Sequence, residues 1–213
     1  MKPRLSILVT AGPTREKIDP IRFISNYSTG TFGYEIAREA GRRGHRVTLI
    51  TGPTCLDTPP GSRRIDVESA RQMQRAVEKE TRRCDVLIMA AAVSDWRPQR
   101  QSPGKIKRGR GMCRLSLIEN PDILKTVSGR KGIVTVGFAL ETKDLEKNAA
   151  KKLSEKNLDM IVANRLKKGG NLFGAGKIDI LIIDRLGNRG LFRKRTKKGL
   201  AKIILDKALN FNI

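Results

Sequence analysis

The sequence predicts an α/β fold of the Rossmann-like kind, with a mostly parallel, doubly wound sheet that ends in a C-terminal hairpin and helix. Apolar runs of strand length alternate with segments of helical periodicity, which is typical of a parallel sheet covered by helices. The first strand, at 5–10, is followed by a long loop rich in Gly, Ser and Thr and then by a helix. That order presents backbone N–H groups to a phosphate.

Each further element follows from a local pattern. The helix predicted at 33–43 ends at Gly44, because glycine commonly terminates helices. Continuous apolar runs indicate strands that are buried on both faces, and apolar residues at helical spacing indicate amphipathic helices. Pro121 at the first position, with Asn120 as the cap, predicts the start of a short helix. The expected strands are 45–50, 65–67, 86–92, 115–118, 133–139 and 159–163, and the expected helices are 69–83, 121–127 and 143–156.

The C-terminal part predicts a hairpin of strands 178–183 and 191–193, turning at Gly187-Asn188, followed by a basic helix at 197–210. A chain of 213 residues suits a single domain over 1–213. The hairpin and helix form an appendage at roughly 170–213.

Composition limits the class of protein. The sequence contains no apolar run long enough to span a membrane and no signal-peptide pattern at its start. Cys55, Cys84 and Cys113 form no C-x-x-C pair, and the sole histidine, His45, lies far from any partner for catalysis. We therefore expect a cytoplasmic, reduced chain with no membrane partner, no hydrolase triad and no structural metal.

The net charge of +23 has two interpretations. It can indicate nucleic-acid binding, or a surface suited to anionic small molecules. Aromatic residues are few and do not alternate with the basic clusters, which extend over the whole chain. We therefore expect no specific recognition of nucleic acid, since charge alone supports only sequence-independent attraction.

Polar segments follow several of the predicted strands. They are 12–26, Ser94-Asp95, Glu141-Thr142 and Asn164. Ligands of open α/β sheets bind at the carboxyl ends of the strands. The sequence therefore predicts one cleft built from several loops.

Each candidate residue in this cleft also has a structural interpretation. Segment 28–33 can cradle a phosphate or simply cap a helix. Asp95 can accept bonds from a ribose, bind Mg²⁺ through water, or cap a helix. Lys152 and Lys156, one turn apart, can meet one anion or form a solvated face. The basic loop around Lys105 can be a mobile flap or a solvated charged loop, and Phe138 can be a core residue.

Six collinear segments carry a family resemblance. They are AGPTREKIDPIRFISNYSTGTFG at 11–33, AAAVSDWRP at 90–98, KIKR at 105–108, ENPDIL at 119–124, GFALET at 137–142 and KKLSEKNLDMIVAN at 151–164. In this order they resemble phosphopantothenoylcysteine synthetase of the coenzyme A pathway. The resemblance extends from the first strand to about Asn164 and weakens beyond it.

The resemblance implies a ligase that joins 4′-phosphopantothenate to L-cysteine through an acyl-cytidylate, driven by CTP with Mg²⁺. It implies a homodimer with the site close to the subunit interface. No flavin-dependent decarboxylase half is recognisable, so a stand-alone synthetase that needs a separate decarboxylase is expected. A nucleotide- or nucleic-acid-binding protein on the same scaffold, without ligase activity, is the alternative function.

The same resemblance assigns residues. Asn26 assists the acyl-nucleotide intermediate, or else simply forms a turn, and Lys105 closes over the nucleotide. The metal ligands are not assigned. Departures from the family pattern are Thr31, where many relatives carry a basic residue, Arg165, and segment 167–176. The nucleotide-binding residues implied are Gly12, Ser28, Gly30, Gly33, Ala90, Ala91, Asp95, Lys105, Asn120, Pro121, Asp122, Ile123, Phe138, Lys152 and Lys156.

Overall fold

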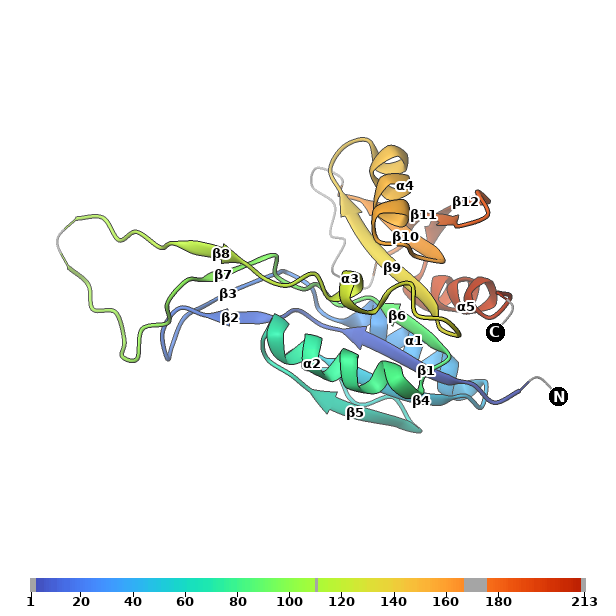
Figure 1. Ribbon diagram of the computed structural model, residues 1–213, viewed down its shortest axis with the longest axis horizontal. Helices are drawn as coiled ribbons and strands as arrows, with labels where there is room; N and C mark the ends of the chain where they lie inside the picture. The colour runs from blue at the N-terminus through green and yellow to red at the C-terminus, as the bar shows by residue number, and fades with distance from the viewer. Residues whose placement is uncertain (1–2, 110, 167–175, 212–213) are drawn as a thin grey trace.

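The structure is a computed structural model that describes residues 3–109, 111–166 and 176–211 (Figure 1). Its centre is an eight-stranded sheet. The strands are β1 (Ser6–Ala11), β4 (Arg46–Thr51), β5 (Ser62–Asp66), β6 (Val86–Met89), β9 (Val134–Glu141), β10 (Met160–Arg165), β11 (Ile178–Asp184) and β12 (Arg189–Arg195). The helices are α1 (Thr31–Arg42), α2 (Ala70–Glu80), α3 (Ile123–Val127), α4 (Leu145–Glu155) and α5 (Lys197–Ala208), and η1 (Thr81–Arg83) extends α2.

The sheet confirms the predicted parallel, doubly wound fold. Its strand order is β12-β11-β10-β9-β6-β1-β4-β5. The neighbouring strands β10, β9, β6, β1, β4 and β5 pair in parallel. Val9 of β1 lies opposite Leu49 on one side and Ile88 on the other. The terminal hairpin adds β11 and β12 in antiparallel pairing. Consequently β12 runs in the same direction as β10, and α5 begins at the sheet edge where the parallel strands end.

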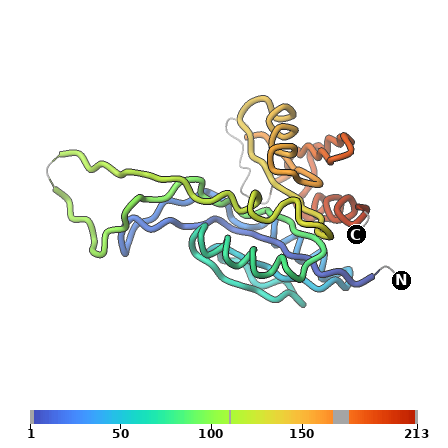
Figure 2. The backbone as a smooth tube through the Cα atoms, viewed as in Figure 1, coloured from blue at the N-terminus to red at the C-terminus, as the bar shows by residue number. Residues whose placement is uncertain are grey.

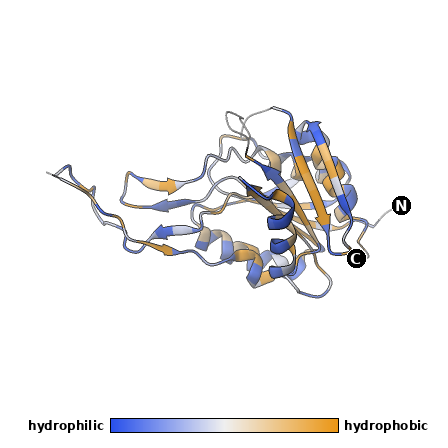
Figure 3. Cartoon of the chain, turned by 90° about the horizontal axis from the view of Figure 1, so that it is seen from above, coloured by the Kyte–Doolittle hydropathy of each residue, from blue (hydrophilic) through white to orange (hydrophobic). Residues whose placement is uncertain are grey.

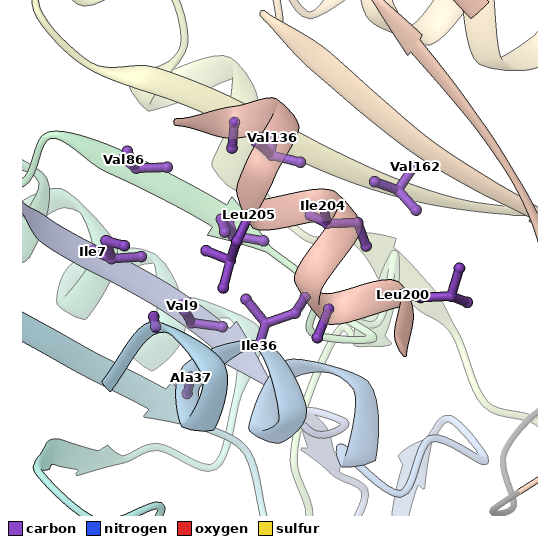
Figure 4. Close-up of a cluster of buried hydrophobic side chains, with 14 of the residues drawn as sticks. Ile7, Val9, Ile36, Ala37, Val86, Val136, Val162, Leu200, Ile204 and Leu205 are labelled. Atoms are coloured by element: carbon purple, nitrogen blue, oxygen red, sulfur yellow. The ribbon is translucent and has the colours of Figure 1, made fainter. Parts of the chain in front are cut away.

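The two faces of the sheet bury different helices. Alternate residues of β1 point to opposite faces, so Ile7 and Val9 join one apolar cluster while Leu8 joins the other. Helices α1 and α5 cover the first face, and α2, α3 and α4 cover the second. Figure 4 shows side chains of α1 and α5 meeting those of the sheet in the first cluster. The labelled residues are Ile7, Val9, Ile36, Ala37, Val86, Val136, Val162, Leu200, Ile204 and Leu205.

An arm extends from the sheet at the carboxyl ends of the parallel strands (Figures 1 and 2). It consists of two antiparallel pairs, β2 (Arg15–Lys17) with β3 (Phe23–Ser25) and β7 (Trp96–Pro98) with β8 (Leu117–Glu119), together with the described residues 99–109 and 111–116 between β7 and β8. The sequence analysis predicted an unbroken loop between the strand at 5–10 and the helix at 33–43, and this prediction is wrong because β2 and β3 lie within that segment. Strands of three residues carry too short a pattern to be recognised.

Several element boundaries also differ from the prediction. The strand predicted at 65–67 occupies Ser62–Asp66, and the one predicted at 115–118 occupies Leu117–Glu119. The second hairpin strand occupies Arg189–Arg195 and is longer than the predicted 191–193. Its polar, basic sequence lies on an exposed sheet edge, so no apolar run marks its full length. Part of the predicted appendage, and most of the departing segment 167–176, lie outside the described residues. None of the described helices is long and apolar enough to cross a membrane.

Gly33 sets the distance between α1 and β1. A Cβ atom added at Gly33 would lie 2.6 Å from the Cβ of Ala11 and 2.9 Å from the carbonyl oxygen of Thr10. Only a residue without a side chain lets the first turn of α1 approach the end of β1 this closely. The start of α1 is therefore held directly against the strand end.

We predict that Gly33→Ala lowers the free energy of unfolding by about 1–2 kcal/mol. The clash costs more than the roughly 0.5–1 kcal/mol that alanine gains in a helix. Chemical denaturation measures the change. Gly199→Ala in α5 is the control, because the Cβ added there would lie 3.3 Å from the hydroxyl of Thr196 and meet no closer atom. Equal stability of the two variants would contradict the close-approach role of Gly33.

Candidate active site

A cleft of about 880 Å³ opens at the carboxyl ends of the parallel strands. Ligands of α/β sheets bind in this position, and the volume is typical of small-molecule sites. The cleft brings together most of the residues singled out in the sequence. They are Asn26, Ser28, Gly30, Ala90, Ala91, Asp95, Asn120, Pro121, Asp122, Ile123, Phe138, Lys152 and Lys156.

Three singled-out residues, all within the described part of the chain, are not among those lining the cleft: Gly12, Gly33 and Lys105. Gly12 has a positive φ of 73°, and a Cβ there would lie 2.9 Å from the carbonyl oxygen of Gly52. Gly12 and Gly33 thus allow close packing behind the cleft wall. Their assignment to nucleotide contact stays a prediction.

The Ala92 bridge, formed by Gly12, Thr14, Asn26 and Ala92, joins the loops that follow β1 and β6. The backbone N–H of Ala92 donates to Gly12 O at 2.9 Å, and Thr14 N donates to Ala92 O at 3.2 Å. The Asn26 side chain joins them, with Nδ2 donating to Ala92 O at 3.0 Å. An Asn amide carries two N–H donors. One therefore fixes the side chain to the bridge, and the other can serve a ligand.

The first turn of α1 borders the cleft. Its N-cap is Gly30, with a positive φ of 79° and no side-chain capping bond. The hydroxyls of Thr29 and Thr31 lie 2.8 Å apart and hydrogen-bond to each other. The ordinary Ser/Thr helix cap, the structural alternative for 28–33, is therefore not formed. Phe32 packs edge-to-face on Phe138, with ring centroids 5.2 Å apart, so the aromatic wall of the cleft is fixed to α1.

The two predicted lysines bind different carboxylates. Lys152 Nζ lies 2.7 Å from Glu141 Oε1, and Lys156 Nζ lies 3.0 Å from Asp122 Oδ2. Both line the cleft, but each ammonium is held by its own acidic partner. The departing residue Arg165 ends β10 and donates to the carbonyl of Thr142 at 3.3 Å.

Asn120 organises the opposite rim. Its Nδ2 donates to Ser94 O at 2.9 Å, and its backbone N–H donates to Asp95 O at 2.7 Å. The prediction that Asn120 caps the following helix is wrong. The N-cap of α3 is Asp122, whose carboxylate accepts from Lys125 N at 3.4 Å. The Asn120 side chain instead spans the gap between neighbouring strand ends.

Metal ligands are sparse in the described part of the chain. It contains no group of three or more His, Cys, Asp or Glu side chains that could enclose an ion. Asp95 is exposed on the cleft wall. A single carboxylate of this kind suits Mg²⁺, which commonly binds one or two carboxylates together with substrate phosphates. The donor set therefore fits an ion that arrives with a phosphorylated ligand.

Lys197 is a cleft residue that the sequence analysis missed. It is the first residue of α5, lines the cleft, and is only 7% exposed. Desolvation by burial lowers the pKa of its ammonium. The sequence predicted a basic helix here but not its position at the cleft. That position follows from the hairpin, because β12 runs back to the end of the sheet at which β10 ends. A buried lysine at this edge adds positive charge to the site.

Lys105 lies on the arm, in the loop between β7 and β8, and its side chain is exposed. The adjacent residue, Ile106, is hydrogen-bonded to Asp19 and Arg22 of the β2–β3 turn. Within one copy of the chain, the arm therefore holds Lys105 away from the residues that line the cleft.

Comparisons with known proteins agree with this architecture. The profile of the DNA/pantothenate metabolism flavoprotein C-terminal domain matches residues 3–211. A protein from an unknown prokaryotic organism, named cysteine/cysteine sulfinic acid decarboxylase, is 45% identical over 208 residues, covering 95% of this chain and 57% of that protein. The coenzyme A biosynthesis bifunctional protein CoaBC of Vibrio cholerae is 42% identical over 189 residues, covering 87% of this chain and 47% of that protein.

Among solved structures, the crystal structure of the C-terminal domain of CoaBC matches with a TM-score of 0.81 and 39% identity. This match covers 95% of the present chain and 93% of the chain in the crystal structure. The chain thus spans about half the length of the curated relatives it matches, whereas the structural match extends over nearly the whole of both chains.

Proposed function

The chain belongs to the family of DNA/pantothenate metabolism flavoprotein C-terminal domains, and we propose that it joins 4′-phosphopantothenate to L-cysteine in coenzyme A biosynthesis. One observation carries the proposal. A single cleft gathers residues from five of the six segments on which the resemblance depends. The names of the longer relatives differ, decarboxylase in one and bifunctional protein in the other. The proposal therefore depends on the cleft of this chain, and not on the name of either relative.

The chemistry needs an activated acyl group, because a carboxylate at neutral pH is a poor acyl donor. In the proposed reaction the carboxylate of 4′-phosphopantothenate attacks the α-phosphate of CTP, and pyrophosphate leaves. The amine of cysteine then attacks the mixed anhydride, the new amide bond forms, and CMP leaves with the electron pair of the broken acyl–phosphate bond. Holding the reactants together supplies much of the rate enhancement.

The cleft contains the groups that such a reaction needs. Asn26, fixed to Ala92 O at 3.0 Å, can direct its second N–H at a phosphoryl or acyl oxygen without changing its protonation state. Lys152, Lys156 and Lys197 bring ammonium groups to the cleft, which can bind the phosphates of a nucleoside triphosphate and of a phosphorylated acid. Phe138, a partly buried residue within β9 that lines the cleft, offers an apolar surface to a base.

Mg²⁺ is proposed as the companion of the triphosphate. Asp95 is the carboxylate that would contact it, with the remaining ligands coming from phosphate oxygens and water. When bound, the ion neutralises phosphate charge and orients the nucleotide.

We further propose that the protein acts as a homodimer in which Lys105 serves the cleft of the partner copy. Lys105 lies outside the cleft of its own chain. The arm also exposes large apolar side chains, and Figure 3 shows hydrophobic segments, in orange, on its strands. Among them are Ile21, Phe23, Trp96 and Leu117, which are 61%, 44%, 47% and 41% exposed. Such groups indicate an interaction surface, and isolated two-stranded pairs are barely stable alone.

The decisive assay for the ligase is release of pyrophosphate by the purified protein. We expect release that depends on both 4′-phosphopantothenate and CTP, and formation of CMP that depends additionally on cysteine. ATP in place of CTP tests the choice of nucleotide. Nucleotide binding without turnover under any of these conditions would support the alternative, a binding protein on the same scaffold.

We predict that Asn26→Asp lowers kcat by about 10²-fold or more with little change in thermal stability. A carboxylate at this position repels phosphate oxygens and cannot donate a hydrogen bond. Ser25→Ala is the control on the adjacent residue, because Ser25 is not among the residues that line the cleft and its hydroxyl donates to Thr14 O. Turnover at the wild-type rate in Asn26→Asp would reject the assignment.

Complementation tests the exchange of Lys105 between copies. Asn26→Asp and Lys105→Ala chains are each expected to be nearly inactive. If Lys105 serves the partner, half of the sites in each mixed dimer are intact, and random mixing restores about a quarter of the wild-type activity. If Lys105 serves its own cleft, every site in the mixture keeps one defect. Absence of restored activity, with mixed dimers demonstrated by two affinity tags, would therefore reject the exchange.

A further inference from the structure

Asp19 is a buried carboxylate in a part of the molecule that has little core. It is 2% exposed, in the turn between β2 and β3. Its Oδ1 accepts from the backbone N–H groups of Ile21 at 2.9 Å and Arg22 at 2.8 Å, which closes the turn. Its Oδ2 accepts from the guanidinium of Arg22, with Nε at 3.0 Å and a second bond from Nη2. The I-D-P-I-R segment thus folds around this one side chain.

The same carboxylate reaches a segment more than eighty residues away. Oδ2 also accepts from the backbone N–H of Ile106 at 3.1 Å, and Arg22 Nη2 donates to the carbonyl of Ile106 at 2.7 Å. Both polar groups of the Ile106 backbone are therefore held by one Asp–Arg pair. A further bond, from Ser102 N to Ile18 O at 2.9 Å, fixes the start of the same loop. We name Asp19, Arg22 and Ile106 the arm clamp.

The arm clamp restrains its loop at a point where side-chain packing is sparse. Pro103, Gly104, Lys105 and Lys107 are exposed, so side-chain packing contributes little there. Burying an ionised carboxylate is unfavourable unless hydrogen bonds compensate it. The bonds from Arg22, and then from the backbone N–H groups, hold the pKa of Asp19 well below its usual range. The charge that forms the clamp is therefore present throughout the physiological pH range.

We propose that Asp19 is a positioning residue that sets the orientation of Lys105 by clamping the backbone of Ile106. This inference rests on the proposed function, in which Lys105 contacts the nucleotide. Lys105 directly precedes Ile106 in the chain, so the clamp fixes the backbone from which the Lys105 side chain extends. A displacement of about an ångström in a positioned group can cost 10²-fold in rate. Asp19 itself need not touch a ligand for this effect.

The test is Asp19→Asn, which keeps the shape of the side chain. An amide has one acceptor oxygen instead of two, so its NH₂ group would face either the Arg22 guanidinium or the backbone N–H groups. We expect kcat/KM to fall by about 10-fold or more, from the loss of positioning, with a nearly unchanged melting temperature. The control is Asp66→Asn, which removes the carboxylate of an exposed ion pair with Arg64 at 2.8 Å and should leave activity unchanged.

A double-mutant cycle separates positioning from general support of the fold. In a Lys105→Ala background, Asp19→Asn should change the remaining kcat/KM by less than about twofold, because residues that act through one another are not additive. A loss as large as in the wild-type background would overturn the inference, since Asp19 would then act without Lys105.

A second measurement needs no activity. Limited trypsin digestion of the folded protein should cleave after Lys105, Lys107 and Arg108 severalfold faster in Asp19→Asn than in wild type or Asp66→Asn. Equal cleavage rates would overturn the arm clamp. If wild-type protein releases no pyrophosphate, the proposed ligase function fails, while the digestion still tests whether Asp19 holds the loop.

Discussion

The backbone of Ala92 is the point on which the site depends. Its N–H and C=O groups join the loop after β1 to the loop after β6, and the Asn26 side chain is held by the same carbonyl. Neighbouring parallel strands end side by side, but their loops are free to diverge unless something fixes them. This bridge does so at the centre of the sheet, where β1 and β6 are paired. The wall of the cleft therefore inherits the rigidity of the two strands, which catalytic positioning requires.

Charge in the cleft is organised before any ligand arrives. In a chain of net charge +23, the cleft lysines Lys152 and Lys156 are each held within 3.0 Å of a carboxylate. Such partners orient the ammonium groups and lower their mutual repulsion. They also reduce non-selective attraction, because an anion must compete with Glu141 or Asp122 for the same N–H donors. A ligand that carries several phosphate charges at fixed spacing is favoured over a single anion in that competition.

The sequence predicted those parts of the molecule whose physics is local. Apolar runs such as 5–10 and 86–92 located the central strands, and polar residues at their ends located the cleft. Contacts between distant segments could not be predicted in this way. The hairpin β2–β3 depends on Asp19 and on Arg15 stacked over Phe23 at 4.5 Å. Asn120 appeared to be a cap, but Asp122 fills that position because Asn120 bonds to Ser94 across the rim.

The proposed site depends on two kinds of support. Residues on the cleft wall depend on a sheet with apolar clusters on both faces, so their positions share the stability of the whole domain. Lys105 depends instead on an arm whose described segments are short strand pairs and exposed loops, joined to each other through Asp19 and Arg22. Elements that move during function come from the least stable parts of a fold. The clamp bonds lie within the arm, whereas the base of the arm is fixed to the start of α2, where Arg15 N donates to Glu68 O at 2.7 Å and Ala70 N donates to Glu16 Oε1 at 2.8 Å. The arm therefore keeps its own shape through Asp19 and Arg22, and its place on the domain through β2.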